Sequence, residues 1–128
     1  MKVLLDTCAL IWSTMSPSAL SRQAREMIAD EGNVILVSAA SAWEIATKVR
    51  AGKLPGAEKL ERDYLEVMEE AGYTQLAIDT ESALRAGRLV ADHRDPFDRM
   101  IAAQALALDV PVLSPDSQFD QFGVRRMW

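Results

Sequence analysis

The sequence opens with Lys2-Val3-Leu4-Leu5-Asp6-Thr7, a short apolar run that ends at a carboxylate. Two further stretches, Val34 to Val37 and Val112 to Leu113, repeat this order of a few apolar residues followed by polar ones. Short continuous apolar runs of this kind are typical of buried strands. We expect a third strand at Gln75 to Ile78 and an edge strand at Val124 to Trp128.

Amphipathic segments lie between the expected strands. Their apolar residues recur at helical spacing: Leu20, Ala24, Met27 and Ile28, then Leu60, Tyr64, Leu65 and Met68, then Ile101, Ala105 and Leu108. Parallel strands need crossover connections, which helices usually supply. The alternation therefore predicts an α/β fold, a three-layer α/β/α sandwich with a central, mainly parallel sheet.

Length and composition favour one soluble domain that spans residues 1 to 128. The chain has 128 residues, of which 49% are hydrophobic and 26% charged, so it can bury one sizeable core. No apolar stretch approaches the roughly 20 residues that cross a bilayer. The N-terminal apolar run is also shorter than the about 7 to 15 residues of a secretory signal. We therefore expect a cytoplasmic protein without a membrane segment.

Residue counts exclude several kinds of site. Cys8 is the only cysteine, which excludes an internal disulfide and a zinc site built on paired thiolates. His93 is the only histidine, which excludes a mechanism with two imidazoles. The 19 acidic and 14 basic residues give a formal charge of -5, which argues against broad electrostatic binding to nucleic acid but leaves room for a local basic rim.

Four acidic residues stand where an open parallel sheet binds its ligands, beyond the carboxyl ends of the strands. Asp6 and Asp116 follow expected strands. Glu44 lies just inside the helix after the second apolar run, and Asp98 lies near the start of the last amphipathic helix. We expect these four carboxylates to face one cleft.

Such a cluster needs a cation. Each pair of carboxylates about 4 Å apart repels by on the order of 4 kcal/mol at an effective dielectric constant near 20. Mg²⁺ or Mn²⁺ would balance this charge, because both prefer oxygen ligands and keep several waters. The cluster suits phosphodiester hydrolysis, in which the metal lowers the pKa of a water, orients it and offsets charge in the transition state.

Taken singly, each acid also has a structural interpretation. Asp6 can cap the following helix. The order Ser41-Ala42-Trp43-Glu44 fits a capping box, in which Glu44 would reach back to a backbone N–H. Asp98 can complement a helix dipole in the first turn, and Asp116 can begin a turn.

Read together, four ordered motifs resemble those of PIN-domain ribonucleases, and most closely the VapC-type toxins of bacterial toxin–antitoxin pairs. The motifs are Leu4-Leu5-Asp6-Thr7, Ser38 to Ile45, Asp95 to Ala105, and Ser114 to Phe119. The resemblance covers nearly the whole chain. It implies an Mg²⁺- or Mn²⁺-dependent endoribonuclease. Attack by a metal-activated water, rather than by the 2′-hydroxyl of the RNA, would leave 5′-phosphate and 3′-hydroxyl ends.

The resemblance also implies roles and partners. The catalytic, metal-binding acids would be Asp6, Asp98 and Asp116, with Glu44 completing or orienting the metal sphere. A cognate antitoxin protein would occupy the cleft, and the chain would form a homodimer.

Other residues are expected to support the four acids or to meet the substrate: Thr7, Ser114, Asp95 and Arg99. Ser114 stands where the family often has threonine, and its hydroxyl is expected to orient Asp116 or a water. Asp95 is expected to be a supporting or turn residue. Arg99, and with less weight His93, could contact a phosphate.

Four further residues are interpreted as structural. Lys48 belongs to a solvated helix end and can pair with Glu44 at i,i+4 spacing. Trp12 and Trp43 are expected in the core rather than as base-stacking platforms. Cys8 is expected in the core or the cleft wall.

Two other functions remain open at this point. An aspartate-based phosphotransfer domain has a similar size and sheet, but Asp6 is followed by Thr7 and Cys8, so the expected adjacent acid is missing. A catalytically silent PIN-like binding module would act by contact alone. The presence of all four acids argues against it.

Overall fold

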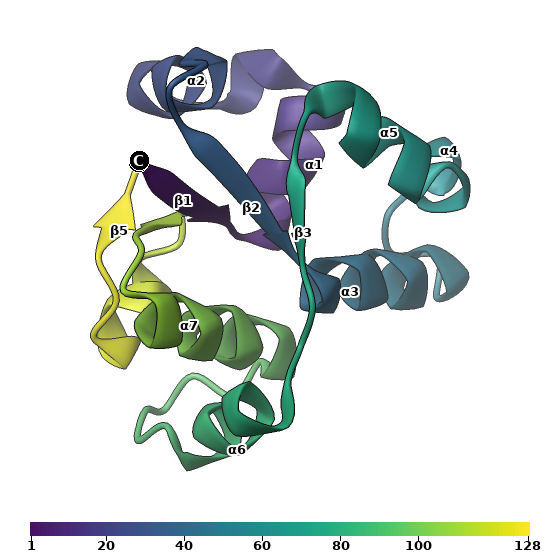
Figure 1. The fold of residues 1–128 in the computed structure, drawn as a ribbon. Coiled ribbons are helices and arrows are strands. Elements are labelled where there is room, and N and C mark those ends of the chain that lie inside the picture. The colour runs from purple at the N-terminus through teal and green to yellow at the C-terminus, as the bar shows by residue number, and fades with distance from the viewer.

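One five-stranded sheet forms the centre of the molecule, and every strand pair in it is parallel. The computed structural model describes residues 1–128. The strand order is β3-β2-β1-β4-β5 (Figure 1). The strands are β1 (Lys2–Leu5), β2 (Val34–Ser38), β3 (Thr74–Leu76), β4 (Val112–Leu113) and β5 (Arg126–Met127).

Helices fill the connections and cover both faces of the sheet. They are α1 (Thr7–Met15), α2 (Arg22–Ala29), α3 (Ala39–Arg50), α4 (Glu58–Arg62), α5 (Tyr64–Ala71), α6 (Thr80–Arg88) and α7 (Pro96–Leu108), with 3-10 turns η1 (Pro17–Ala19) and η2 (Ser117–Phe122). No helix combines the length and apolar character that a membrane crossing needs.

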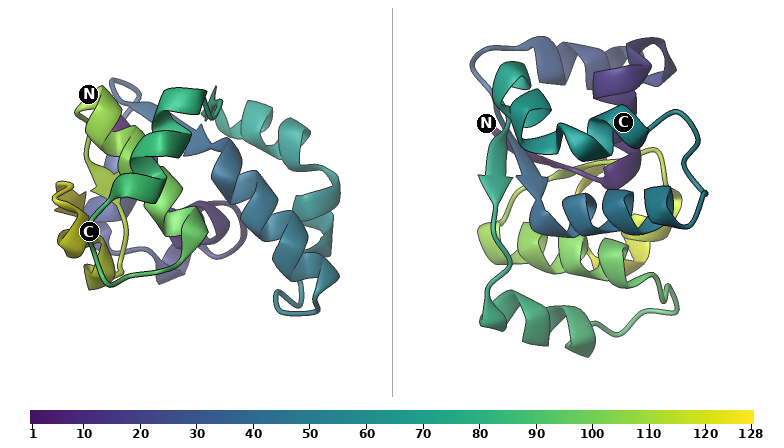
Figure 2. Two further views of the ribbon diagram at one scale, coloured as in Figure 1. Left: turned by 90° about the horizontal axis from the view of Figure 1, so that it is seen from below. Right: turned by 90° about the vertical axis from the view of Figure 1, so that its right-hand side faces the viewer.

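Successive side chains of β1 point to opposite faces, and this divides the core into two layers. Val3 and Leu5 pack with residues of α1, α2 and α5, whereas Leu4 packs with residues of α7 and η2. All three side chains are fully buried. In Figures 1 and 2, α7 accordingly lies on one side of the sheet, with α6 outside it and farther from the strands. The predicted three-layer α/β/α sandwich is confirmed.

The structure corrects several sequence-based boundaries. The third strand is Thr74–Leu76, not Gln75 to Ile78. The segment expected as one helix is divided into α4 and α5 at Asp63, whose backbone leaves helical geometry. Helix α6 was not predicted, because it buries only Ser82 and Ala86 and so lacks a broad apolar face.

Trp43 is also not a core residue, since 60% of its surface is exposed. Its indole instead meets the ring of Phe97 edge to face, with the ring centres 4.8 Å apart. The expectation of a buried Trp43 was therefore wrong.

Helix α5 offers a matched test of the packing. Met68 is fully buried in the core, whereas Leu65 on the same helix is 73% exposed. We expect Met68→Ala to lower the free energy of unfolding by about 2–5 kcal/mol through lost burial and a cavity. Leu65→Ala should change it by about 0.5 kcal/mol or less. Urea unfolding monitored by circular dichroism measures both, and equal losses would contradict this arrangement of the core.

Candidate active site

Asp6 lies at the end of β1, beside β4, at the centre of the sheet. It is the N-cap of α1: its Oδ1 accepts a hydrogen bond from the backbone N–H of Ala9 at 2.7 Å. Its Oδ2 accepts from the hydroxyl of Ser114 at 2.6 Å. The residue is 3% exposed. The capping interpretation is confirmed, and the cap fixes a buried carboxylate at the strand end.

The pKa of Asp6 is raised to about 7, chiefly by burial, and the nearby charges of Asp98 and Glu44 contribute to this rise. The hydrogen bonds from Ser114 and Ala9 act in the opposite direction, because they stabilise the ionised form. Three of the four predicted acids are thus close enough for their charges to interact.

Glu44 lies in the second turn of α3 and is 5% exposed. Its Oε2 forms an ion pair with the ammonium of Lys48, and its Oε1 is buried without a hydrogen-bond partner. The capping-box interpretation was wrong, because α3 begins earlier: Ser38 is the N-cap and accepts from the N–H of Ala40. Ser41 instead shares a 2.9 Å hydrogen bond with the hydroxyl of Thr7, which joins α3 to α1.

Asp98 lies in the first turn of α7 and contacts His93. The N-cap of α7 is Asp95, which accepts from the N–H groups of Phe97 and Asp98. The carboxylate of Asp98 is left to hydrogen-bond with His93, whose Nε2 lies 2.7 Å from Oδ2. Burial raises the pKa of Asp98 to about 6, the charges of Asp95 and Glu44 add to the rise, and His93 opposes it.

Asp116 is the N-cap of η2 and accepts from the N–H of Gln118 at 2.9 Å. One ligand atom each from His93, Asp98 and Asp116 lies within 4.8 Å of the others. This spacing brings together the last two predicted acids, and it adds an imidazole that the sequence analysis had considered only for phosphate contact.

Ser114 connects two of the acids. Its hydroxyl donates to Asp6 and accepts from the backbone N–H of Asp116 at 3.0 Å. From the sequence, this hydroxyl was expected to orient Asp116 or a water. In the structure the hydroxyl of Ser114 instead orients the carboxylate of Asp6, and its only contact with Asp116 is with the backbone N–H.

Arg99, which was expected to contact a phosphate, has a different role in the structure. Its guanidinium donates to backbone carbonyls around the loop between α6 and α7, namely those of Ala86, Leu89, Ala91 and His93. Its donors are therefore engaged in holding the loop that carries His93, rather than directed at a substrate.

The donor set fits a divalent cation. Burial, and to a lesser extent the neighbouring carboxylates, disfavour the charged forms of Asp6 and Asp98 and raise their pKa values, and a buried oxygen of Glu44 lacks a partner. The thiol of Cys8 adds no nucleophile, because burial and the neighbouring carboxylates raise its pKa to about 12. Carboxylate oxygens suit Mn²⁺ as well as Mg²⁺.

A family model described as PIN domain matches residues 3–124. The chain belongs to the PIN domain family. A curated relative, Ribonuclease VapC16 of Mycobacterium tuberculosis, is 42% identical over 57 residues, which span 44% of this chain but only 40% of that relative. The family resemblance inferred from the four motifs is therefore confirmed.

Solved structures share the fold of this PIN domain. A VapBC2 complex from Rickettsia felis bound to a promoter DNA fragment matches with a TM-score of 0.72 and 15% identity, over 100% of this chain and 99% of that one. VapBC-1 from nontypeable Haemophilus influenzae matches with a TM-score of 0.69 and 15% identity, over 99% and 97%.

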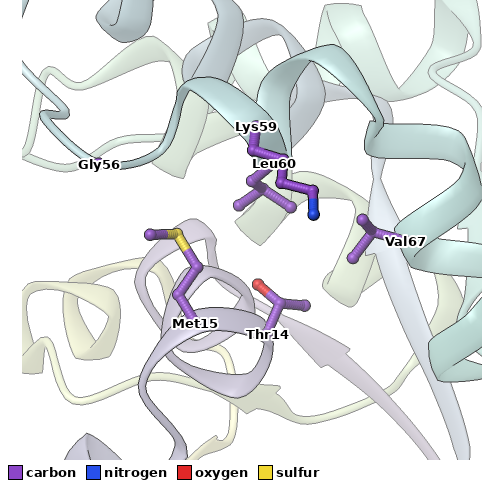
Figure 3. Close-up of a pocket in the computed structure, with 6 residues that line it drawn as sticks. All are labelled: Thr14, Met15, Gly56, Lys59, Leu60 and Val67. Carbon is purple, nitrogen blue, oxygen red and sulfur yellow. The ribbon is translucent and has the colours of Figure 1, made fainter.

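Two cavities of this PIN domain lie at different distances from the acids. One of about 240 Å³ adjoins the site and is lined by Thr7, Cys8, Ile11, Trp12, Glu44, Lys48 and Leu54. The other, of about 350 Å³, lies between the end of α1 and helices α4 and α5, where Figure 3 shows Met15 and Leu60 on opposite walls. It contains no acid of the site, so we assign it no part in the chemistry.

The sequence did not reveal the full role of two contacts in the site, Glu44 with Lys48 and His93 with Asp98. The Glu44–Lys48 spacing of four residues pointed to their pairing, but not to its place among the acids. No sequence pattern pairs His93 with Asp98, because a loop of irregular backbone separates them.

The raised carboxyl pKa values predict how stability depends on pH without divalent ions. Between about pH 4 and 7 the folded protein binds more protons than the unfolded chain, so the free energy of unfolding falls as the pH rises. The fall should reach a few kcal/mol, since one pKa unit corresponds to about 1.4 kcal/mol. Asp6→Asn should flatten this slope in urea unfolding measured from pH 4.5 to 7.5.

Asp79→Asn is the matched control, because Asp79 also caps a helix but its pKa is lowered by hydrogen bonds from Ser82. It should leave the slope in this pH range unchanged. An equal slope in wild type and Asp6→Asn would show that Asp6 does not have the raised pKa.

Proposed function

We propose that this chain is a divalent-metal-dependent endoribonuclease, the toxin of a toxin–antitoxin pair, with residues 1–128 acting as one nuclease domain. The observation that carries the proposal is the gathering of acids from four separate segments: Asp6, Glu44, Asp98 and Asp116. Membership of the PIN domain family and the likeness to a relative named as a ribonuclease support it.

Asp98 and Asp116 are the proposed direct ligands, with His93 beside them, because their ligand atoms lie within 4.8 Å of one another. Asp6 and Glu44 would complete the negative pocket around a bound Mg²⁺ or Mn²⁺. The ion would supply an activated water and positive charge for the phosphate in the transition state.

The chain's own residues would supply the protons that metal binding releases and would hold the side chains of the site in position. The raised pKa values of Asp6 and Asp98, about 7 and about 6, mean that part of the Asp6 population and a smaller part of the Asp98 population would carry a proton near neutral pH, and metal uptake would release it. Ser114 would keep Oδ2 of Asp6 in one orientation, and Arg99 would hold the loop that carries His93.

The proposed partners are RNA as substrate and a cognate antitoxin protein, in the cytoplasm where cellular RNA is available. The titles of two structures with this fold name VapBC complexes, which supports an antitoxin as a partner. We also propose a homodimer. Its support is the exposed indole of Trp43 beside an apolar cavity of about 210 Å³ that Ile78 and Met100 help to line.

The two alternatives have less support. A phosphotransfer role needs Asp6 to attack a phosphate donor, but both of its oxygens accept hydrogen bonds and it is buried. A silent binding module does not require acids that cost folding energy. It remains the outcome if no RNA is cleaved.

Replacement of a proposed ligand tests the activity. Asp98→Asn keeps the shape of the side chain but removes its charge, so it should lower Mn²⁺-dependent RNA cleavage by on the order of 100-fold or more. Asp92→Asn, at an exposed position in the loop before α7, should cleave normally. Sequencing of RNA 5′ ends should find 5′-phosphate ends with wild type. Cleavage that persists in EDTA, or 2′,3′-cyclic phosphate products, would contradict the proposal.

The homodimer has its own test. Trp43→Lys places a charge in the proposed apolar contact and should convert the dimer to a monomer in light scattering after size-exclusion chromatography. Leu65→Lys, at a more exposed apolar position on α5, should leave the mass unchanged. A wild-type monomer, or loss of the dimer only with Leu65→Lys, would refute this contact.

A further inference from the structure

Lys48 brings a permanent positive charge into the acidic site. It lies one turn after Glu44 on α3, and its ammonium forms an ion pair with Oε2 of that residue. The side chain of Glu44 is 7% exposed and that of Lys48 is 38% exposed. The lysine therefore reaches inward from a half-exposed position to a carboxylate that water does not solvate.

Two guanidinium groups near the acids are engaged with other partners. The guanidinium of Arg99 donates to backbone carbonyls, and Arg126 pairs with Asp120. The cavity of about 240 Å³ is lined by one acidic residue, Glu44, and one cationic residue, Lys48, and its other lining residues are uncharged. Lys48 is thus the cation that the chain itself provides next to Glu44.

The position of Lys48 bears on how many metal ions the site can hold. In two-metal phosphodiester sites the ions lie about 3.5–4 Å apart and are held by neighbouring carboxylates. The ligand atoms of His93, Asp98 and Asp116 are grouped closely enough for one ion. A second ion would need Glu44, but Lys48 already holds one of its oxygens.

We propose that Lys48 is the second cation of the site: its ammonium takes the place that a second divalent ion would occupy beside Glu44, so the protein binds one divalent ion. This inference rests on the proposed metal dependence. It gives Glu44 and Lys48 a joint positioning role, in which the lysine neutralises the carboxylate that otherwise would recruit metal. The unpartnered Oε1 of Glu44 remains available to face the single ion or its waters.

Replacement of Lys48 should then open the second position. In Lys48→Met the buried carboxylate of Glu44 loses its counter-charge, and a divalent ion is the most effective substitute. Lys48→Arg keeps the positive charge and should keep the second position closed. Glu44→Gln combined with Lys48→Met removes both charges, so nothing remains to attract the second ion.

Mn²⁺ titration at pH 7.5, followed by electron paramagnetic resonance and calorimetry, tests the proposal without any activity assay. We expect one Mn²⁺ per chain for wild type, one for Lys48→Arg, two for Lys48→Met and one for the double variant. The two ions in Lys48→Met should broaden each other's spectrum through spin coupling, which an ion bound elsewhere on the acidic surface would not do. Circular dichroism checks that each variant is folded.

The outcomes separate this inference from the proposed function. Two coupled ions in wild type would overturn the role of Lys48 while supporting metal dependence. One ion in a folded Lys48→Met, or a second ion without spin coupling, would also overturn it. No bound Mn²⁺ in wild type would overturn the proposed metal dependence and this inference together. If Lys48→Met does not fold, Lys48→Gln, which also removes the charge, takes its place: two coupled ions would support the inference, and one ion would overturn it.

Discussion

The buried carboxylate of Asp6 is the constraint on which the site depends. It stands at the end of the central strand, and two donors hold it: the N–H of Ala9 in the first turn of α1 and the hydroxyl of Ser114 after β4. These bonds connect β1, α1 and β4 at the edge where the chain order of the sheet reverses. Binding sites of open parallel sheets form at such a point. Since β1 is fully buried apart from its first residue, Asp6 cannot move without disturbing the core.

Helix N-termini partly stabilise this concentration of negative charge. Asp6 caps α1, Asp116 caps η2, and Asp98 lies in the first turn of α7. The positive end of a helix dipole favours a carboxylate at each position. The compensation is incomplete, because burial still raises the pKa of Asp6 and Asp98 well above that of a free carboxyl group. The fold thus retains a cluster of buried carboxylates that lowers its stability. Such a trade of stability against function is typical of binding and active sites.

Much of this arrangement was predictable from local sequence. Apolar runs located the strands, and the parallel fold then placed Asp6, Glu44, Asp98 and Asp116 near one edge of the sheet. Local patterns failed where tertiary contacts decide the outcome. The Ser41–Glu44 spacing suggested a cap, but Ser38 begins the helix, and its hydroxyl also bonds Gln104 of α7. The pairing of His93 with Asp98 depends on the path of an irregular loop that Arg99 holds through backbone carbonyls.

The central claim is that these acids form one pocket that a divalent ion neutralises. Anomalous diffraction from crystals soaked in MnCl₂ tests it most directly, because the anomalous peak gives the position of the ion without reference to activity. The account predicts a peak bounded by the carboxylates of Asp98 and Asp116, with Asp6 and Glu44 on the opposite side. A peak at another part of the surface, or a well-diffracting soaked crystal without any peak in this pocket, would contradict the account.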